Sequence, residues 1–312
     1  MQVFVVGSFV VACSVIVARL PRAGESLDAA AFVSEPGGKG FNLALALHRL
    51  GFGITGVFAI GDDAFAAIAE SAFAGSGLGG EMLVRHPGST GAGVGFVDAR
   101  GENCLAVSLG ANRLLDAGDV ERAGPSLDAA SLVVATFESP DAPIRAAFVR
   151  ARARGAATLL NPSPSRPIDS AILAATTVLV VNRIEADDLG LDGSGIAEGG
   201  TGEAARFEAL SAQGPELIVV TLGEQGALAY RRGRWFRQAA FPVAVVDTIG
   251  AGDAFAAGLS EGLLRERPIE ECLCRAAACG ALTACRLGAF DAFPTAEALD
   301  AFLAAPHAAG HL

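Results

Sequence analysis

A chain of 312 residues can bury a substantial core, as one large α/β domain or as two smaller ones. Its net charge of −11 argues against nucleic acid as the main partner, because a phosphate backbone requires clustered cations. Although 52% of the residues are hydrophobic, no run reaches the roughly 18 uninterrupted apolar residues that a membrane span needs. No basic segment precedes the strand-like residues 3–6, so we expect no signal peptide, no membrane partner and a cytoplasmic protein.

Through residue 110 the apolar pattern predicts strands with two helices between them. Strands are expected where β-branched and other apolar residues run together, at 3–6, 9–17, 31–33, 54–60, 92–98 and 104–109. Helical spacing of apolar residues follows a glycine cluster at 41–49 and an Asp-Asp pair at 64–74. The glycine-containing turn at 99–103 joins the last two strands and predicts a hairpin.

After residue 112 the chain alternates strand, helix, strand, helix. Strands are expected at 132–137, 158–161, 178–182, 217–221, 226–230, 235–238 and 241–246. Helices are expected at 142–154, 183–189 and 202–213, and from residues 251, 269 and 295. Such alternation predicts a doubly wound, mostly parallel α/β sheet with helices on both faces, in a single domain spanning residues 1–312.

Two N-terminal segments, at about 10–36 and 91–110, add strands outside this alternation. We expect them to form a small β-sheet lid over the carboxyl edge of the main sheet, where open α/β sheets bind ligands. Apolar strands that project from a body leave an exposed patch or sheet edge. We therefore expect the lid to pair with a second copy of the chain in a homodimer.

Two residue types in the second half allow more than one interpretation. The turn of the 226–238 hairpin carries Arg231, Arg232 and Arg234, which either contact a nucleotide phosphate or lie in a solvated turn. The six cysteines lack the paired CxxC spacing of a zinc site. Cys272 and Cys279 stand among alanines, which favours buried thiols acting as small hydrophobic residues.

The segment 247–255, Asp-Thr-Ile-Gly-Ala-Gly-Asp-Ala-Phe, is the strongest candidate for catalysis. We expect a helix to begin near Asp253, where unpaired N–H groups carry partial positive charge, and Gly250, Ala251 and Gly252 leave those groups accessible to an anion. A carboxylate beside an anion site is suited to take a proton from a hydroxyl that attacks phosphorus. The alternative is a structural turn in which Asp253 merely favours the helix start.

Lys39 is the only lysine among 23 basic residues, and it lies in the cluster Gly37-Gly38-Lys39-Gly40. This indicates that a slim point charge is needed there and that the planar fork of arginine would not serve. Two common nucleotide motifs are absent, because the chain contains neither GxGxxG after its first strand nor GxxxxGK[ST]. A dinucleotide dehydrogenase and a Walker-type ATPase are therefore disfavoured.

The glycine turn at 37–42 and the Asp253 turn, in this order on an alternating α/β chain, resemble the two signature segments of the ribokinase (PfkB-type) carbohydrate kinase family. Ordered matches to that family extend over nearly the whole chain. They are Pro21-Arg22-Ala23-Gly24-Glu25, Ser89-Thr90-Gly91, Gly110-Ala111-Asn112, Phe137-Glu138-Ser139-Pro140, Asn161-Pro162-Ser163-Pro164, Asn182-Arg183-Ile184-Glu185 and Thr221-Leu222-Gly223.

The resemblance implies an ATP-dependent kinase that uses Mg²⁺ and transfers the γ-phosphoryl group to a hydroxymethyl group of a small sugar or sugar-like substrate. It implies that Asp253 is the general base and that the amides of Gly250, Ala251 and Gly252 form the anion hole. The implied sugar contacts are Gly38, Lys39, Asn42 and Glu138. The implied ATP and Mg²⁺ contacts are Asn182, Glu185, Thr221 and Gly223, with Glu185 acting on Mg²⁺ through water.

Structural alternatives accompany these roles. Asn182 has the sequence context of a helix cap, Glu138 that of a surface loop residue, and Lys39 that of a solvated side chain. The physical case for the functional roles is nevertheless independent of the resemblance. Mg²⁺ prefers one or two carboxylates with water and phosphates, and an asparagine both donates to and accepts from sugar hydroxyls.

The chain departs from the family at positions that concern the substrate. Ribokinases carry an Asn and an Asp that hold sugar hydroxyls where this chain has Val10 and Ala12. We therefore expect ribose to be a poor substrate, unless Glu25 or Asp28 of the lid segment replaces the missing partners.

A second departure concerns a monovalent cation. Ala292 takes the place of a serine that helps to bind one in ribokinases. Asp247 and backbone carbonyls are the candidate ligands that are left, so activation by K⁺ stays open.

Two other functions stay open at this point. The apolar segment 9–13 is compatible with a nucleoside, which makes a nucleoside kinase of the same fold the nearest alternative. A catalytically silent ligand-binding sensor belongs to a different class. Loss of Asp253 would be its mark, and Asp253 is present together with its anion hole.

Overall fold

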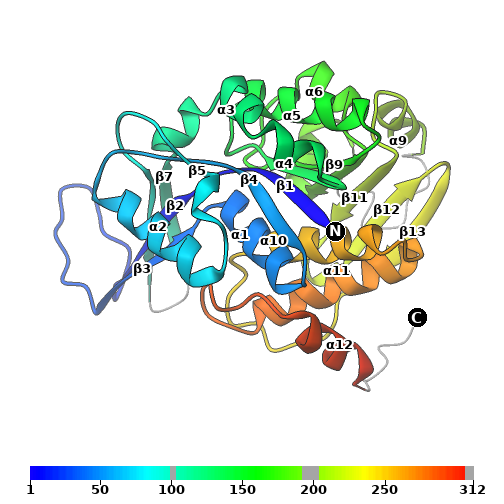
Figure 1. Ribbon diagram of the computed structural model, residues 1–312. Helices are drawn as coiled ribbons and strands as arrows, with labels where there is room; N and C mark the ends of the chain where they lie inside the picture. Colours follow the sequence, from blue (N-terminus) through cyan, green and yellow to red (C-terminus); the bar gives the residue numbers. More distant parts are fainter. Residues whose placement is uncertain (99–102, 192–203, 306–312) are drawn as a thin grey trace.

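The computed structural model describes residues 1–98, 103–191 and 204–305. The turn expected at 99–103 and the first residues of the helix expected at 202–213 thus lie partly outside the described residues. In the described part, the chain forms a large sheet between two layers of helices, with a smaller sheet at one end (Figure 1).

The main sheet has nine strands in the order β13-β12-β11-β10-β9-β8-β1-β4-β5. Their bounds are β1 (Gln2–Gly7), β4 (Gly53–Ile60), β5 (Leu83–Arg85), β8 (Leu132–Thr136), β9 (Ala157–Asn161), β10 (Val178–Asn182), β11 (Leu217–Thr221), β12 (Ala227–Arg231) and β13 (Arg234–Gln238). All neighbours pair parallel except β11 with β12 and β12 with β13, which are antiparallel. The two antiparallel strands form the hairpin expected near residue 232.

Both faces of this sheet are buried, which explains the nearly continuous apolar runs of its strands. Val3 and Val5 of β1 belong to one core cluster, and Phe4 and Val6 belong to the other. The first cluster contains α1 (Lys39–Arg49), α2 (Ala64–Ser76), α10 (Ala251–Leu264), α11 (Ile269–Ala284) and α12 (Ala296–Ala304). The second contains α3 (Ala117–Arg122), α4 (Gly124–Asp128), α5 (Asp141–Ala153), α6 (Ser170–Ala174), α7 (Arg183–Asp188) and α9 (Ala204–Ser211).

The predicted α/β fold, with a mostly parallel sheet between helices and a small additional sheet, is therefore confirmed. Cys272 and Cys279 of α11 are buried in the first core cluster, as expected of small hydrophobic residues. Among the described residues, none of the helices is both long enough and apolar enough to cross a membrane.

The small sheet consists of β3 (Ala31–Gly37), β2 (Val10–Ile16), β6 (Gly91–Val97) and β7 (Asn103–Ser108), in that order. β2 pairs parallel with β6, and the two outer pairs are antiparallel. Asn112 ties this sheet to the body, because its side chain accepts a hydrogen bond from the Phe9 amide (3.0 Å) and donates to the carbonyls of Phe9 (2.7 Å) and Leu109 (2.8 Å). We call these four strands the lid sheet; they lie at the left of Figure 1.

The strand expected at 241–246 is wrong, because these residues form no strand. Val245 and Val246 are 62% and 60% exposed, and the Val246 amide donates to the carbonyl of Ala284 (2.8 Å). The segment follows the edge strand β13 and leads to the start of α10, and Pro242 has no N–H to donate to a sheet ladder. Apolar composition alone does not distinguish such a crossing segment from a buried strand.

Candidate active site

The start of α10 is the candidate anion site. Gly250, the residue before the helix, has a left-handed φ of 77°, and a Cβ there would lie 2.9 Å from the Cβ of Ala289. Both facts require glycine. The N–H groups of the first turn have no intrahelical partner, and among the described residues no side chain caps them, although the N–H of Ala251 donates to the carbonyl of Thr248 (3.2 Å). Within the part of the chain that the structure describes, a Cβ added to Gly252 would meet no neighbouring atom within 4 Å, so the helix start opens onto free space. Together with the helix dipole, this geometry attracts an anion.

Asp253 lies in that first turn and is only 6% exposed. The side-chain amide of Asn42 donates to its Oδ2 (2.9 Å), and Nζ of Lys39 lies 3.6 Å from its Oδ1. The Asp253 carboxylate raises the pKa of Lys39, and this effect outweighs the burial that would lower it. The glycine turn at 37–42 and the Asp253 turn, although 211 residues apart at Asn42 and Asp253, thus meet in one site.

Glu138 follows β8 and lies beside Lys39. Its Oε2 accepts hydrogen bonds from the hydroxyl of Ser8 (2.6 Å) and from the backbone N–H of Lys39 (2.7 Å). Burial raises the pKa of Glu138 although both hydrogen bonds oppose this. The alternative of a surface-loop glutamate therefore does not apply.

Ser8 was missed by the sequence analysis. It is fully buried, and its Oγ also accepts a hydrogen bond from the N–H of Gly40 (3.1 Å). Its position could have indicated a role, because Ser8 directly follows the first strand of a parallel sheet, and such sheets bind ligands at the carboxyl ends of their strands.

Gly38 brings the start of α1 against the turn between β1 and β2. It has a φ of 98°, and a Cβ at this position would lie 2.9 Å from both the carbonyl oxygen of Ser8 and the amide nitrogen of Val10. No other residue fits this approach. The backbone of Lys39 is thereby held within hydrogen-bonding distance of Glu138.

A second group of residues lies at the ends of β10 and β11, where Asn182 and Thr221 are register partners. Asn182 caps α7 in a capping box: its Oδ1 accepts from the N–H of Glu185 (2.9 Å), and Oε2 of Glu185 accepts from the N–H of Asn182 (2.9 Å). The Thr221 hydroxyl donates to the carbonyl of Val181 (3.4 Å). Gly223, with a φ of 60°, opens the short 3₁₀ helix η4 (Gly223–Gln225) beyond it.

The two groups are close enough to interact electrostatically. Glu185 is buried, and its carboxylate contributes to the raised pKa of Lys39, together with Asp253 and Glu138. The helix-capping alternative for Asn182 is realised, but Oε1 of Glu185 has no part in the capping box.

Asp247 ties the turn before α10 to the loop after α11. Its Oδ1 accepts a hydrogen bond from the N–H of Ile249 (3.0 Å), and its Oδ2 accepts one from the N–H of Gly288 (3.0 Å). Ala292, further along the same loop, is buried. Both oxygens of Asp247 are thus already in use by the backbone.

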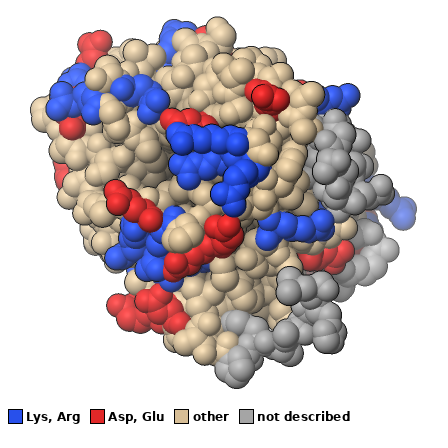
Figure 2. Space-filling model, turned by 90° about the vertical axis from the view of Figure 1, so that its right-hand side faces the viewer, with Lys and Arg blue, Asp and Glu red and all other residues tan. Residues whose placement is uncertain are grey.

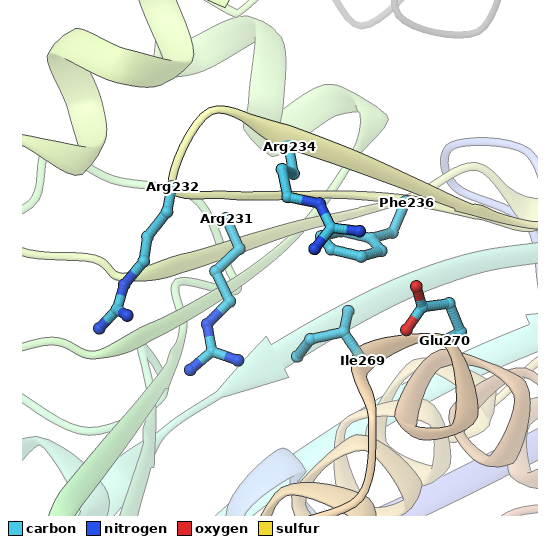
Figure 3. A pocket seen from close by; sticks show the side chains of 6 residues that line it. All are labelled: Arg231, Arg232, Arg234, Phe236, Ile269 and Glu270. Atoms are coloured by element: carbon cyan, nitrogen blue, oxygen red, sulfur yellow. The ribbon is translucent and has the colours of Figure 1, made fainter.

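The arginines of the β12–β13 hairpin lie at the opposite edge of the main sheet. In the antiparallel register Thr221 pairs with Ala227 and Ile218 with Tyr230, so Arg231 is at the far end from Thr221. Figure 3 shows the shallow pocket of about 290 Å³ that they line, and its residues are Arg231, Arg232, Arg234, Phe236, Ile269 and Glu270.

These arginines therefore lie away from the group formed by Asn182 and Thr221 at the other end of the strands. The molecule viewed from that side carries its basic side chains in several groups next to acidic ones (Figure 2). The alternative of a solvated turn therefore applies to the hairpin.

A helix start open to an anion, with a buried carboxylate beside it, suits the transfer of a phosphoryl group to an alcohol. Comparison with known proteins agrees with this class. The sequence model of the pfkB carbohydrate kinase family matches residues 1–296 of this chain. The chain belongs to this family, which is the one that its motifs resemble.

Similar proteins cover the same length. Deoxyribokinase from Salmonella typhi is 30% identical over 308 residues, which are 97% of this chain and 99% of that protein. Ribokinase from Bacillus subtilis is 28% identical over 304 residues, which are 97% of this chain and 99% of that protein. The structure of Arabidopsis thaliana ribokinase complexed with ribose and ATP has a TM-score of 0.87 and 25% identity, and covers 98% of this chain and 99% of that one.

Proposed function

We propose that this protein transfers the γ-phosphoryl group of ATP to the hydroxymethyl group of a small sugar. The observation that carries the proposal is the buried carboxylate of Asp253 in the first turn of α10, beside open N–H groups and in contact with Asn42 and Lys39. A carboxylate placed there repels a phosphate at rest. It becomes useful when it accepts a proton.

The proposed step uses Asp253 as the general base. The hydroxymethyl O–H bond breaks as its proton passes to the Asp253 carboxylate, and the oxygen forms a bond to the γ-phosphorus. The bond between that phosphorus and the bridging oxygen breaks, and ADP leaves. The amides of Gly250, Ala251 and Gly252 would stabilise the charge that develops on the transferred phosphoryl group.

The sugar would bind between the lid sheet and the start of α1. Lys39 and Asn42 hold the base in place from that side, and Glu138 presents a half-buried carboxylate that can accept from sugar hydroxyls. The backbone of Gly38 would contact the sugar at the start of α1. Among the described residues, the buried Oδ1 of Asn42 has no hydrogen-bond partner, and a sugar hydroxyl would supply one.

ATP would lie toward β10 and β11, with Thr221 and Gly223 on its nucleotide side and with Asn182 and Glu185 near its phosphates. In the described part of the chain, no three His, Cys, Asp or Glu side chains gather as metal ligands. This fits Mg²⁺ held mainly by phosphates and water, with Glu185 as a carboxylate contact through water. The ion would neutralise phosphate charge when bound.

A potassium site fits the residues less well. A cation beside Asp247 would share the carboxylate with two backbone N–H groups, and Ala292 offers it no side-chain oxygen. We therefore propose an activity that depends little on K⁺. Equal rates in potassium and sodium salts at matched ionic strength are expected, and a severalfold stimulation by K⁺ would contradict this.

The proposal includes a homodimer formed through the lid sheet, and a cytoplasmic location where ATP is supplied. Exposed apolar side chains support the dimer on both faces of the lid sheet, where Phe32, Val94 and Leu105 lie in solvent. Fractionation against a periplasmic marker tests the location. Neither nucleic acid nor a membrane enters the proposed reaction.

The deciding experiment is an ADP-release assay with ATP and Mg²⁺ over pentoses, 2-deoxyribose, hexoses and nucleosides. The relatives named ribokinase and deoxyribokinase make ribose and 2-deoxyribose the first substrates to test. Turnover with a sugar supports the proposal, and turnover with nucleosides alone would favour the nucleoside kinase. Ligand binding without turnover of any compound would favour the silent sensor.

A further inference from the structure

The lid sheet has one charged side chain. Its four strands read Val-Val-Ala-Cys-Ser-Val-Ile, Ala-Phe-Val-Ser-Glu-Pro-Gly, Gly-Ala-Gly-Val-Gly-Phe-Val and Asn-Cys-Leu-Ala-Val-Ser, in the order β2, β3, β6, β7. Glu35 of β3 is the only ionisable residue among them apart from the two cysteines. A polyhydroxy ligand beneath this sheet would therefore find a single carboxylate there.

The strand register places Glu35 directly opposite Ala12, and Gly37 opposite Val10. Opposed residues of an antiparallel pair point to the same face, with Cβ atoms about 5 Å apart. Ala12 also pairs with Gly93 of β6. Ala12 thus lies between a glycine and Glu35, and its small methyl group leaves room for the longer side chain.

The face that carries Ala12 and Glu35 points away from the core. Val11 and Cys13, which point to the other face, are buried in the core cluster that includes α2. A Cβ added to Gly37 would lie 3.5 Å from the Cβ of Ala12, so this face of the lid sheet continues into the glycine turn at 37–42. Lys39 of that loop contacts Asp253.

The carboxylate of Glu35 faces the loop that follows α11. A Cβ added to Gly288 would be 2.7 Å from its Oε2, and the N–H of Gly288 donates to Asp247 at the start of the catalytic turn. The neighbouring Ala289 packs against Gly250 of the anion site. Glu35 therefore lies between the lid sheet and the turn that carries Asp253.

Glu35 has no hydrogen bond or ion pair within the described residues. It is half-buried, and burial raises its pKa, with further contributions from Asp291 and Asp247. Glu25 and Asp28 do not serve in its place, because Glu25 is bound to Arg19 and Asp28 is exposed on the segment before β3.

We propose that Glu35 determines sugar specificity by accepting hydrogen bonds from neighbouring hydroxyls of the bound sugar, in place of the polar side chain that position 12 lacks. The inference rests on the proposed sugar kinase function. It assigns the lid-side hydroxyl contact to β3, so that a sugar with two adjacent hydroxyls is held although Val10 and Ala12 are apolar.

The test compares the natural chain with Glu35→Ala, Glu35→Ala combined with Ala12→Asp, and the exposed-residue control Glu270→Ala. Each variant is assayed with the best sugar found in the panel, and sugar affinity is measured by calorimetry without ATP. We expect Glu35→Ala to lower kcat/KM for the sugar about ten- to hundredfold, mostly through KM, with the KM for ATP unchanged. Ala12→Asp should restore most of the loss, because it returns a carboxylate to the facing position. Glu270→Ala should match the natural chain.

Three outcomes would overturn the inference. The first is an unchanged kcat/KM and sugar affinity in Glu35→Ala, with the kinase otherwise active. The second is a loss that Ala12→Asp does not restore, which identifies a structural role. The third is a loss that added K⁺ restores, which identifies a cation ligand. If the natural chain phosphorylates no sugar at all, the proposed function fails instead, so the two failures are distinguishable.

Discussion

Replacement of Asp253 by asparagine tests the proposed mechanism most directly. The change keeps the size of the side chain, and an asparagine oxygen can still accept the hydrogen bond from Asn42. It removes the proton acceptor. General-base removal costs about a hundred- to ten-thousandfold in rate, which corresponds to about 2.7–5.5 kcal/mol of activation free energy.

The same change removes the charge that faces Lys39. Two unit charges 3.6 Å apart attract by about 5 kcal/mol at an effective dielectric constant of about 20. Removal of one partner of a buried pair leaves the other charge uncompensated, so Asp253→Asn should also lower the melting temperature, although Glu138 and Glu185 still face Lys39. The pKa of Lys39 should fall in the variant, because Asp253 is the main cause of its increase.

The assay is ADP release at saturating sugar and ATP, with calorimetric ATP binding measured on the same preparations. Asp253→Asn should bind ATP almost as the natural chain does, while kcat falls by the factor above. Asp28→Asn, at an exposed position, is the matched control and should be fully active. Near-natural turnover in Asp253→Asn would refute the general-base assignment.

Four other predictions concern the Mg²⁺ contact, the sugar contact, the buried thiols and the dimer. Glu185→Ala should lower the rate and raise the Mg²⁺ concentration needed for half-maximal activity, and a variant with unchanged rate and Mg²⁺ dependence would show that the capping box is its whole role. Glu138→Gln should lose sugar turnover. It should nevertheless melt at a higher temperature at pH 7, because it removes a charge that burial disfavours while one amide oxygen can accept both hydrogen bonds made to Oε2. Because folding raises the pKa of Glu138, this residue contributes stability below its unfolded pKa, and that stability is lost as the pH rises through the folded pKa. The higher melting temperature of Glu138→Gln should therefore vanish in acid. Scanning calorimetry at several pH values checks this. In a thiol-reagent titration of the native protein, exposed Cys104 should react, whereas burial raises the pKa of Cys272 to about 11 and of Cys279 to about 12 and should protect both until unfolding. Sedimentation at micromolar concentration should give the mass of a dimer that Leu105→Asp dissociates, and a monomeric natural chain would contradict pairing through the lid sheet.

Several features of this protein could be predicted from its sequence because they depend on local pattern. The period of the apolar residues predicted a parallel sheet between helices, because strands buried on both faces must be apolar throughout. Lys39 stood out because it is the only lysine in the chain, and Asp253 stood out because it follows small residues at an expected helix start. Both facts can be taken directly from the sequence. Only the tertiary structure brought the two residues within 3.6 Å of each other.

Other features depend on strand register and on contacts between distant segments, which no local pattern predicts. The antiparallel pairing of β2 with β3 placed Glu35 opposite Ala12, and the hydroxyl of Ser8 reached Glu138 across 130 residues. The antiparallel register of β11 and β12 likewise places Arg231 at the end of the sheet away from Thr221. Residues 241–246 pair with no strand of the described structure. A side chain's type can be taken from its neighbours in sequence, but the groups that it faces are set by how the strands align and pack.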